Sequence, residues 1–203
     1  MLSTDGGQSF TTVLASNTPN DGSQVITLPN VVTTQARIKV ASSNNIFFDI
    51  SNADFTITDA LPDLTPVLYT SPSTHYGNTN FTVVVDVFEI NSVSTSGLVT
   101  ARISKDSKFN LTMPPTATSI GSRSVQNSAW SFSALDPDYY VLTTEQVIDN
   151  GTMLSFGLTG LLSPGATSGI LSISSMLVGG SGGESMSTIA NNVDADKIDY
   201  FQQ

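Results

Sequence analysis

The sequence Asn80-Phe81-Thr82-Val83-Val84-Val85-Asp86-Val87-Phe88-Glu89-Ile90 decides the fold of this chain. Successive side chains of a β-strand point to opposite faces of a sheet. One face of this stretch consists of Phe81, Val83, Val85 and Val87, and the other of Val84, Asp86, Phe88 and Ile90. Because both faces are apolar over part of the length, the stretch predicts a central strand.

Shorter alternating runs surround this strand, and Gly, Pro, Asn and Asp separate them about every ten residues. Helical periodicity is nearly absent. This pattern is typical of a sandwich or barrel, and we predict an all-β fold with two Ig-like antiparallel β-sandwich units. The predicted strands cover residues 10–15, 24–28, 35–41, 46–50, 55–58, 80–90, 98–104, 109–113, 129–132, 139–142, 153–158, 169–178, 185–190 and 198–201.

A domain boundary is predicted in the segment 60–66, where Pro62 and Pro66 stiffen an extended connector. We expect a partial Ig-like sandwich over residues 1–60 and a larger sandwich over residues 61–203. A complete Ig-like sandwich needs about seven strands and ~100 residues, so the first unit is truncated or receives strands from another chain. In both cases we expect an exposed sheet edge, which can recruit further strands.

Composition limits the partners of the chain. Its 203 residues include 17 acidic and 7 basic side chains, a net charge of −10 that disfavours nucleic acid. The chain has no cysteine, so disulfides, thiolate catalysis and cysteine-type zinc sites are excluded.

We find no apolar run of about 18 residues that predicts a membrane span. No signal peptide is visible at the first residues, so we expect any export signal to lie outside this chain.

Two stretches resemble known families. Leu2-Ser3-Thr4-Asp5-Gly6-Gly7-Gln8-Ser9-Phe10, with residues 18–23, 28–31, 36–40 and 46–51, resembles the Ig-like repeat of secreted and surface proteins of Bacteroidetes-type bacteria. This repeat often lies beside reprolysin-like metallopeptidase domains or adhesion modules. Residues 62–65, 81–90 and 162–169 resemble the bacterial surface "conserved repeat" sandwich, although Asn91-Ser92-Val93-Ser94 replaces its usual Asn-Thr-Gly. Both resemblances imply display, spacing or adhesion outside the cell, without catalytic residues.

Candidate polar chemistry is sparse. Gly179-Gly180-Ser181-Gly182-Gly183 matches a nucleophile-elbow pattern, but the only histidine, His75, precedes it in the chain. We therefore predict a flexible hairpin loop between the strands 169–178 and 185–190. Asp194, Asp196 and Asp199 could offer hard oxygens to calcium, the one cofactor we consider. The glycine and distal glutamate of an EF-hand are absent, and a solvated acidic turn explains these aspartates equally well.

Three aromatic residues are candidates for a sugar-binding platform, Trp130, Tyr139 and Tyr140. Asp136-Pro137-Asp138 predicts a loop that could form the rim of such a site. Aromatic side chains also fill cores and interfaces, and core or hairpin packing is the interpretation that we favour for these residues.

Taken together, these features predict a non-catalytic adhesion or spacer module of a bacterial protein, located outside the cell or at its surface. The alternatives are a carbohydrate-binding accessory module, an accessory domain of a secreted metallopeptidase, and a subunit that self-assembles by strand exchange. The expected partners are a protein or glycan at the cell surface, with self-association through a strand edge.

Overall fold

The computed structural model describes residues 1–202, which form sixteen β-strands and three short 3-10 turns but no α-helix. The predicted all-β fold class is therefore confirmed. The chain divides into two compact units, Met1–Ala60 (unit 1) and Leu61–Gln203 (unit 2). That each unit is an independent domain stays a prediction.

Unit 1 contains a single small sheet. The strand β2 (Thr33–Ala41) pairs with β1 (Leu2–Ser3), β3 (Phe48–Ile50) and β4 (Phe55–Ile57). Its core consists of three buried side chains, Leu2, Ala36 and Ile57, with Leu14, Val31, Ile38 and Phe55 partly buried around them. A sandwich needs a second sheet over this face, and none of the residues described in unit 1 forms one.

Two predicted strands of unit 1 are wrong. Residues 24–28 contain no strand, and residues 10–15 contribute only an isolated bridge from Thr12 to Leu2. The alternation of apolar residues in these runs predicted strands, but alternation alone does not show that a strand pairs with a neighbour. Both edges of β2 are occupied by the other three strands, and Val25 is 92% exposed.

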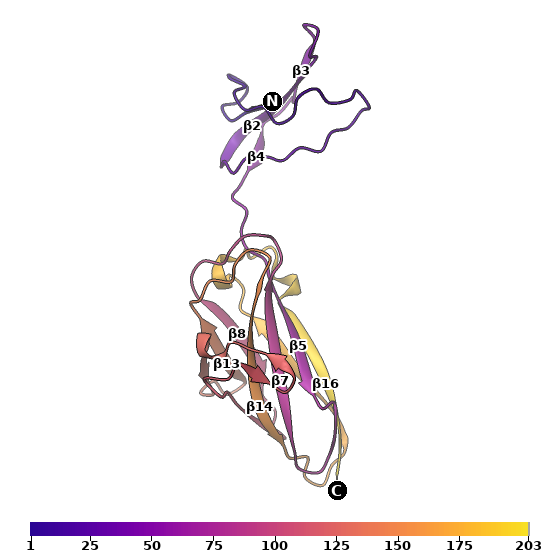
Figure 1. Cartoon of the computed structure of the whole chain (residues 1–203), viewed down its shortest axis with the longest axis vertical. Helices are drawn as coiled ribbons and strands as arrows, with labels where there is room; N and C mark the ends of the chain where they lie inside the picture. The colour runs from indigo at the N-terminus through magenta and orange to yellow at the C-terminus, as the bar shows by residue number, and fades with distance from the viewer. Residues whose placement is uncertain (203) are drawn as a thin grey trace. The chain divides into compact units, whose positions relative to one another are not determined.

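Unit 2 is a β-sandwich of two sheets (Figure 1). The six-stranded sheet has the order β12-β13-β8-β15-β16-β6, and the four-stranded sheet has the order β5-β7-β14-β9. The strands of the larger sheet are β12 (Ser131–Ser133), β13 (Tyr139–Thr144), β8 (Val99–Ser104), β15 (Gly169–Leu177), β16 (Val193–Phe201) and β6 (Thr74–Tyr76). Those of the smaller sheet are β5 (Leu64–Ser71), β7 (Thr79–Glu89), β14 (Met153–Leu162) and β9 (Phe109–Thr112). All described pairings are antiparallel except that of β6 with β16.

The strand β7 confirms the prediction of a central strand, because β5 and β14 flank it. Val83, Val85 and Val87 are fully buried between the two sheets. The other face is covered by the hairpin of β10 (Ser119–Ile120) and β11 (Arg123–Ser124), whose Ile120 packs on Val84. Burial on both faces explains why this stretch is apolar on both sides.

Gly157 of β14 lets the β10–β11 hairpin approach the sheet. It lies opposite Val84, and a Cβ atom there would lie 2.5 Å from Cγ1 of Ile120. This distance is shorter than any ordinary van der Waals contact between carbon atoms. The position therefore requires glycine for steric reasons.

Three further predictions about unit 2 are wrong. Pro66 was expected in a connector but lies within the edge strand β5, where proline is tolerated because an outward-facing position needs no N–H. Residues 185–190 form no strand and lead into the 3-10 turn Ile189–Asn191, so Gly179–Gly183 is a loop but not a hairpin. The acidic segment before residue 198 is part of β16, which begins at Val193.

Candidate functional site

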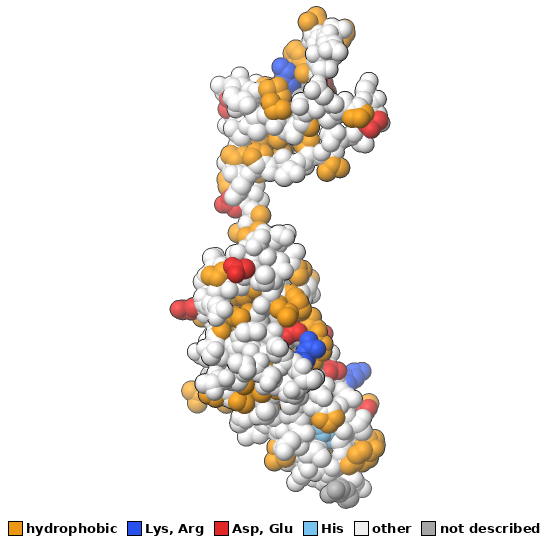
Figure 2. Space-filling model, in the orientation of Figure 1, with side chains coloured by type: hydrophobic (Ala, Val, Ile, Leu, Met, Phe, Trp, Pro, Cys, Tyr) orange, Lys and Arg blue, Asp and Glu red, His pale blue; other side chains and the backbone are white. Residues whose placement is uncertain are grey.

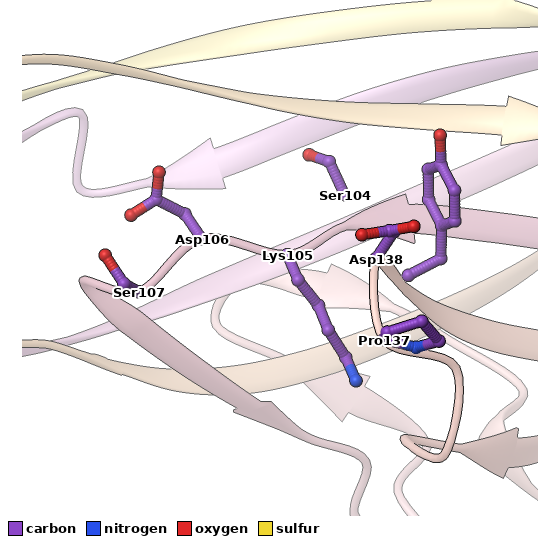
Figure 3. A pocket seen from close by; sticks show the side chains of 7 residues that line it. Ser104, Lys105, Asp106, Ser107, Pro137 and Asp138 are labelled. Atoms are coloured by element: carbon purple, nitrogen blue, oxygen red, sulfur yellow. The ribbon is translucent and has the colours of Figure 1, made fainter.

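A shallow hollow at one end of unit 2 contains one of the predicted aromatic residues (Figure 3). It lies between the loop that follows β8 and the loop that precedes β13, and its volume is about 610 Å³. Its lining consists of Ser104, Lys105, Asp106, Ser107, Pro137, Asp138 and Tyr139. Tyr139 is half-buried, and the guanidinium of Arg102 lies 5.6 Å from the centre of its ring. The hollow thus offers one aromatic ring beside two carboxylates.

Hydrogen bonds fix the second loop of this hollow. Lys105 Nζ donates to the carbonyl oxygens of Ala134 (2.7 Å) and Asp136, so the ammonium group holds the loop that precedes β13 in place. The N–H groups of Asp138 and Tyr139 both donate to Asp136 Oδ1 at 2.9 Å. The N–H of Asp138 is the main reason that the pKa of Asp136 is lowered. The loop is therefore preorganised, and the carboxylates of Asp106 and Asp138 line the hollow.

The other two predicted platform residues lie in the core of unit 2. Trp130 is 5% exposed and packs edge-to-face on Phe156, with ring centres 4.9 Å apart. Tyr140 is 3% exposed, and its hydroxyl accepts the N–H of Leu111 (3.1 Å) and donates to Asn110 Oδ1 (3.0 Å). The three aromatic residues therefore do not form one platform, and Tyr139 alone reaches the surface hollow.

The predicted calcium residues are separated by the geometry of β16. Asp194 and Asp196 point toward β5, whereas Asp199 has the opposite parity and is exposed. The N–H of Leu68 donates to Asp194 Oδ2 (2.7 Å), and the N–H and Oγ1 of Thr70 donate to Asp196 Oδ2 (2.9 and 2.6 Å). These carboxylate oxygens therefore already bind the backbone of β5 and do not converge on one point.

A third carboxylate, which the sequence reasoning missed, completes this arrangement. The side chain of Glu184 is buried, and its Oε1 accepts the N–H of Leu64 (3.0 Å). The pairing of β5 with β7 leaves the backbone N–H and carbonyl groups of residues 64, 66, 68 and 70 pointing away from β7. Three of them donate to carboxylates and the fourth, Pro66, has no N–H. We call this arrangement the capped edge of β5.

The pKa of Asp196 reflects the capped edge. Burial raises the pKa of this carboxyl, but the hydrogen bonds from Thr70 and from the N–H of Lys197 outweigh it and lower the pKa below its ordinary value. Hydrogen bonds to the ionised form lower the pKa in this way. The ionised carboxylate is therefore the form that the fold stabilises.

The remaining buried acids also bind structural partners. Asp86 accepts hydrogen bonds from Ser155 Oγ and Arg123 Nη2, both at 2.6 Å. Burial raises the pKa of Glu89, but the N–H groups of Gly151 and Asn91 donate to its carboxylate and lower the pKa overall. Neither carboxylate faces a cavity that the structure describes.

No catalytic constellation is present among residues 1–202. Ser181 of the glycine-rich motif is buried, and its Oγ accepts the N–H of Thr100 at 3.1 Å. His75 is 1% exposed and is held by Thr79 Oγ1 (2.6 Å) and the carbonyl of Pro72 (2.8 Å). Within the described part of the chain, no three His, Cys, Asp or Glu residues are grouped to hold a metal ion. No helix in the same range is long and apolar enough to span a membrane.

Comparisons with known proteins return structures but no sequence relatives. No protein-family model and no curated protein matches the chain. The CARDB domain of a Pyrococcus furiosus protein, crystallised with di-metal ions, is 14% identical over 72% of this chain and 100% of that domain, with a TM-score of 0.39. A cohesin module from a Clostridium perfringens family 33 glycoside hydrolase is 7% identical over 70% of this chain and 98% of that module, with a TM-score of 0.43.

The sandwich architecture implied by the "conserved repeat" resemblance, which covers residues of unit 2, is present in that unit. Membership of the Bacteroidetes-type Ig-like repeat or of the "conserved repeat" family stays a prediction, because no family model matches.

Proposed function

We propose that this chain is a non-catalytic extracellular module in which unit 2 is a rigid spacer that supports adhesion. The observation that carries the proposal is the capped edge of β5. Glu184, Asp194 and Asp196 are acids of the kind that catalysis or metal binding uses, yet here their oxygens hold backbone N–H groups. Such capping stabilises the sandwich and prevents pairing with other chains.

The other sheet edges of unit 2 support the same role. The β9 edge is capped by the Tyr140 hydroxyl, which binds the outward N–H of Leu111. The six-stranded sheet ends on both sides in strands of only three residues, β12 and β6. Short edge strands of mainly polar residues, here Ser-Phe-Ser and Thr-His-Tyr, offer little to an unwanted partner strand. A sandwich protected in this way can stand beside other modules at a crowded surface without aggregating.

Single-molecule force spectroscopy of the full chain, held between marker domains, tests the spacer role. We expect unit 2 to unfold in one event whose contour length corresponds to residues 61–203, about 500 Å at ~3.5 Å per residue. Gradual extension at low force would contradict a rigid spacer. Proteinase treatment of intact cells of the source organism tests the location, since an external module is cleaved while the membrane stays closed.

A second function is favoured by the hollow beside Tyr139. A half-buried aromatic ring at the surface can stack on a sugar, and the carboxylates beside it can accept hydrogen bonds from the sugar's hydroxyl groups. Glycan-array binding by the full chain, compared with Tyr139→Ala and the control Tyr76→Ala, tests this function. Tyr76 is 62% exposed but lies outside the hollow. Binding that is lost only in Tyr139→Ala supports the glycan site, and equal binding by all three proteins contradicts it.

A further inference from the structure

The edge of β3 in unit 1 is uncapped. β3 pairs with β2 on one side only and lies at the end of its sheet. The N–H of Ser42 donates to the carbonyl of Phe47, and the N–H of Ser51 donates to that of Ile38. Backbone groups alternate in direction along an antiparallel strand, so those of Phe48 and Ile50 point away from β2. No side chain of the described residues caps them, in contrast to the edges of unit 2.

The hairpin that carries this edge is also apolar and exposed. Val40 is 69% exposed, and Ile46, Phe47 and Phe48 are 87%, 71% and 61% exposed. Figure 2 shows hydrophobic side chains on the part of unit 1 that Figure 1 labels β3. With about 150–250 Å² for a whole side chain, the four expose roughly 600 Å² of apolar surface. This area is at the upper end of what a monomeric protein exposes in one patch, and such patches are often functional.

Charge favours contact between copies of this hairpin. The chain carries a net charge of −10, so two copies repel each other over most of their surface. Residues 38–50 contain only Lys39 and Asp49 as charged residues, and this segment is therefore neutral. The Nζ atom of Lys39 lies 4.4 Å from the ring centre of Phe48, so it lies against the aromatic ring of its own copy.

We propose that β3 pairs antiparallel with β3 of a second copy of this chain, around a two-fold axis at Phe48. In this register Phe48 lies opposite Phe48 of the second copy, and Ile46 lies opposite Ile50. These positions share the backbone direction that points away from β2, so the free N–H and carbonyl groups of Phe48 meet their counterparts. The N–H of Ile46, just before β3, donates to Asn45 Oδ1 (2.8 Å) in its own copy and exchanges this partner for the carbonyl of Ile50. On the face that carries Ile46, Phe48 and Ile50, apolar side chains meet apolar side chains, whereas on the other face Phe47 lies opposite Asp49. The sheet becomes continuous across the two copies.

The area sets the strength of this dimer. Two hairpins bury at most about 1,200 Å², the lower limit of specific interfaces. Interfaces of larger area range from micromolar to picomolar affinity. The dimer is therefore weak, with a dissociation constant above about 1 µM. This pairing goes beyond the spacer role of unit 2 and does not depend on it.

Sedimentation velocity of the full chain from about 1 to 500 µM tests the pairing. We expect the weight-average mass of the parent to rise toward that of a dimer. Phe48→Lys places two like charges at the two-fold axis, and we expect it to stay monomeric. The control Val25→Lys changes a side chain of unit 1 that is 92% exposed and lies outside β3, so it should behave as the parent. A monomeric parent, or equal association of parent and Phe48→Lys, would overturn the proposal.

Disulfide trapping tests the register directly. The chain has no cysteine, so Phe48→Cys can cross-link only to Phe48→Cys of a second copy. Directly opposed residues of an antiparallel hydrogen-bonded pair have Cα atoms about 5.5 Å apart, within the range that a disulfide spans. We expect mild oxidation to cross-link Phe48→Cys at least about ten-fold faster than Val25→Cys. Equal rates would refute the register.

Discussion

Replacing Asp196 by alanine removes the acceptor that binds Thr70 at the capped edge of β5. The substitution leaves the N–H and hydroxyl of Thr70, now 2.9 and 2.6 Å from Asp196 Oδ2, without a protein partner. Hydrogen bonds to a charged group contribute roughly 1.5–3 kcal/mol each, less where water replaces the partner. Because this site is partly buried, we expect Asp196→Ala to lower the free energy of unfolding by about 2–3 kcal/mol.

Urea denaturation followed by tryptophan fluorescence measures this change in unit 2 alone. Trp130 is the only tryptophan of the chain, and it lies in the core of unit 2 beside Phe156. Asp199→Ala is the matched control, because Asp199 is an exposed aspartate on the opposite face of the same strand. We expect the control to change stability by less than about 0.5 kcal/mol. If the two variants unfold at the same urea concentration, the carboxylate of Asp196 does not hold β5.

Three further predictions concern pH, the hairpin over β7 and the β9 edge. The pKa values of Asp196 and Glu89 in the folded protein are lower than their ordinary values of 3.8 and 4.5. The stability that these carboxylates contribute is therefore fully present at a pH above the ordinary pKa values. It is lost as the pH falls through the lower pKa values of the folded protein. The urea midpoint should therefore fall steeply below about pH 4, and Asp196→Asn should flatten this fall; an unchanged profile would count against the role of Asp196. Gly157→Ala forces Ile120 away and should lower stability by about 1–3 kcal/mol, whereas a neutral result would mean that the β10–β11 hairpin is loosely attached. Tyr140→Phe keeps the ring but removes the acceptor for a buried N–H of β9, and calorimetry should show a loss of about 1–2 kcal/mol; an unchanged transition would show that water replaces the hydroxyl.

The sequence predicts the core of unit 2 well, for a physical reason. A strand buried on both faces needs apolar residues at successive positions, and residues 83–85 and 87 show this directly. The same logic fails for residues 10–15 and 24–28, where alternation is present but the edges of β2 are already occupied. The alternation of residues shows which side chains a strand would bury, but it does not show whether the segment pairs with a neighbouring strand.

The candidate site, too, could be predicted from the sequence only in part. The alternation of Asp194 and Asp196 places both on one face of a strand, which the sequence alone could have indicated had β16 been predicted to start at Val193. Their partner is β5, about 126 residues away along the chain, and no local signal identifies it. Proline at position 66, at an outward-facing point of an edge strand, was the available clue. Core packing, the favoured interpretation of the aromatic residues, is confirmed for Trp130 and Tyr140, but composition could not distinguish them from Tyr139, because surface platforms use the same residues.

Amide hydrogen exchange at Leu68 and Thr70 tests the capped edge most directly. In an ordinary edge strand, outward amides exchange nearly as fast as exposed loops. The carboxylates of Asp194 and Asp196 should instead protect these two amides at least about 100-fold, and the protection at Thr70 should be lost in Asp196→Ala while the core amides of β7 stay protected. Exchange at Leu68 and Thr70 as fast as at Val25, which is 92% exposed in a loop of unit 1, would contradict the account.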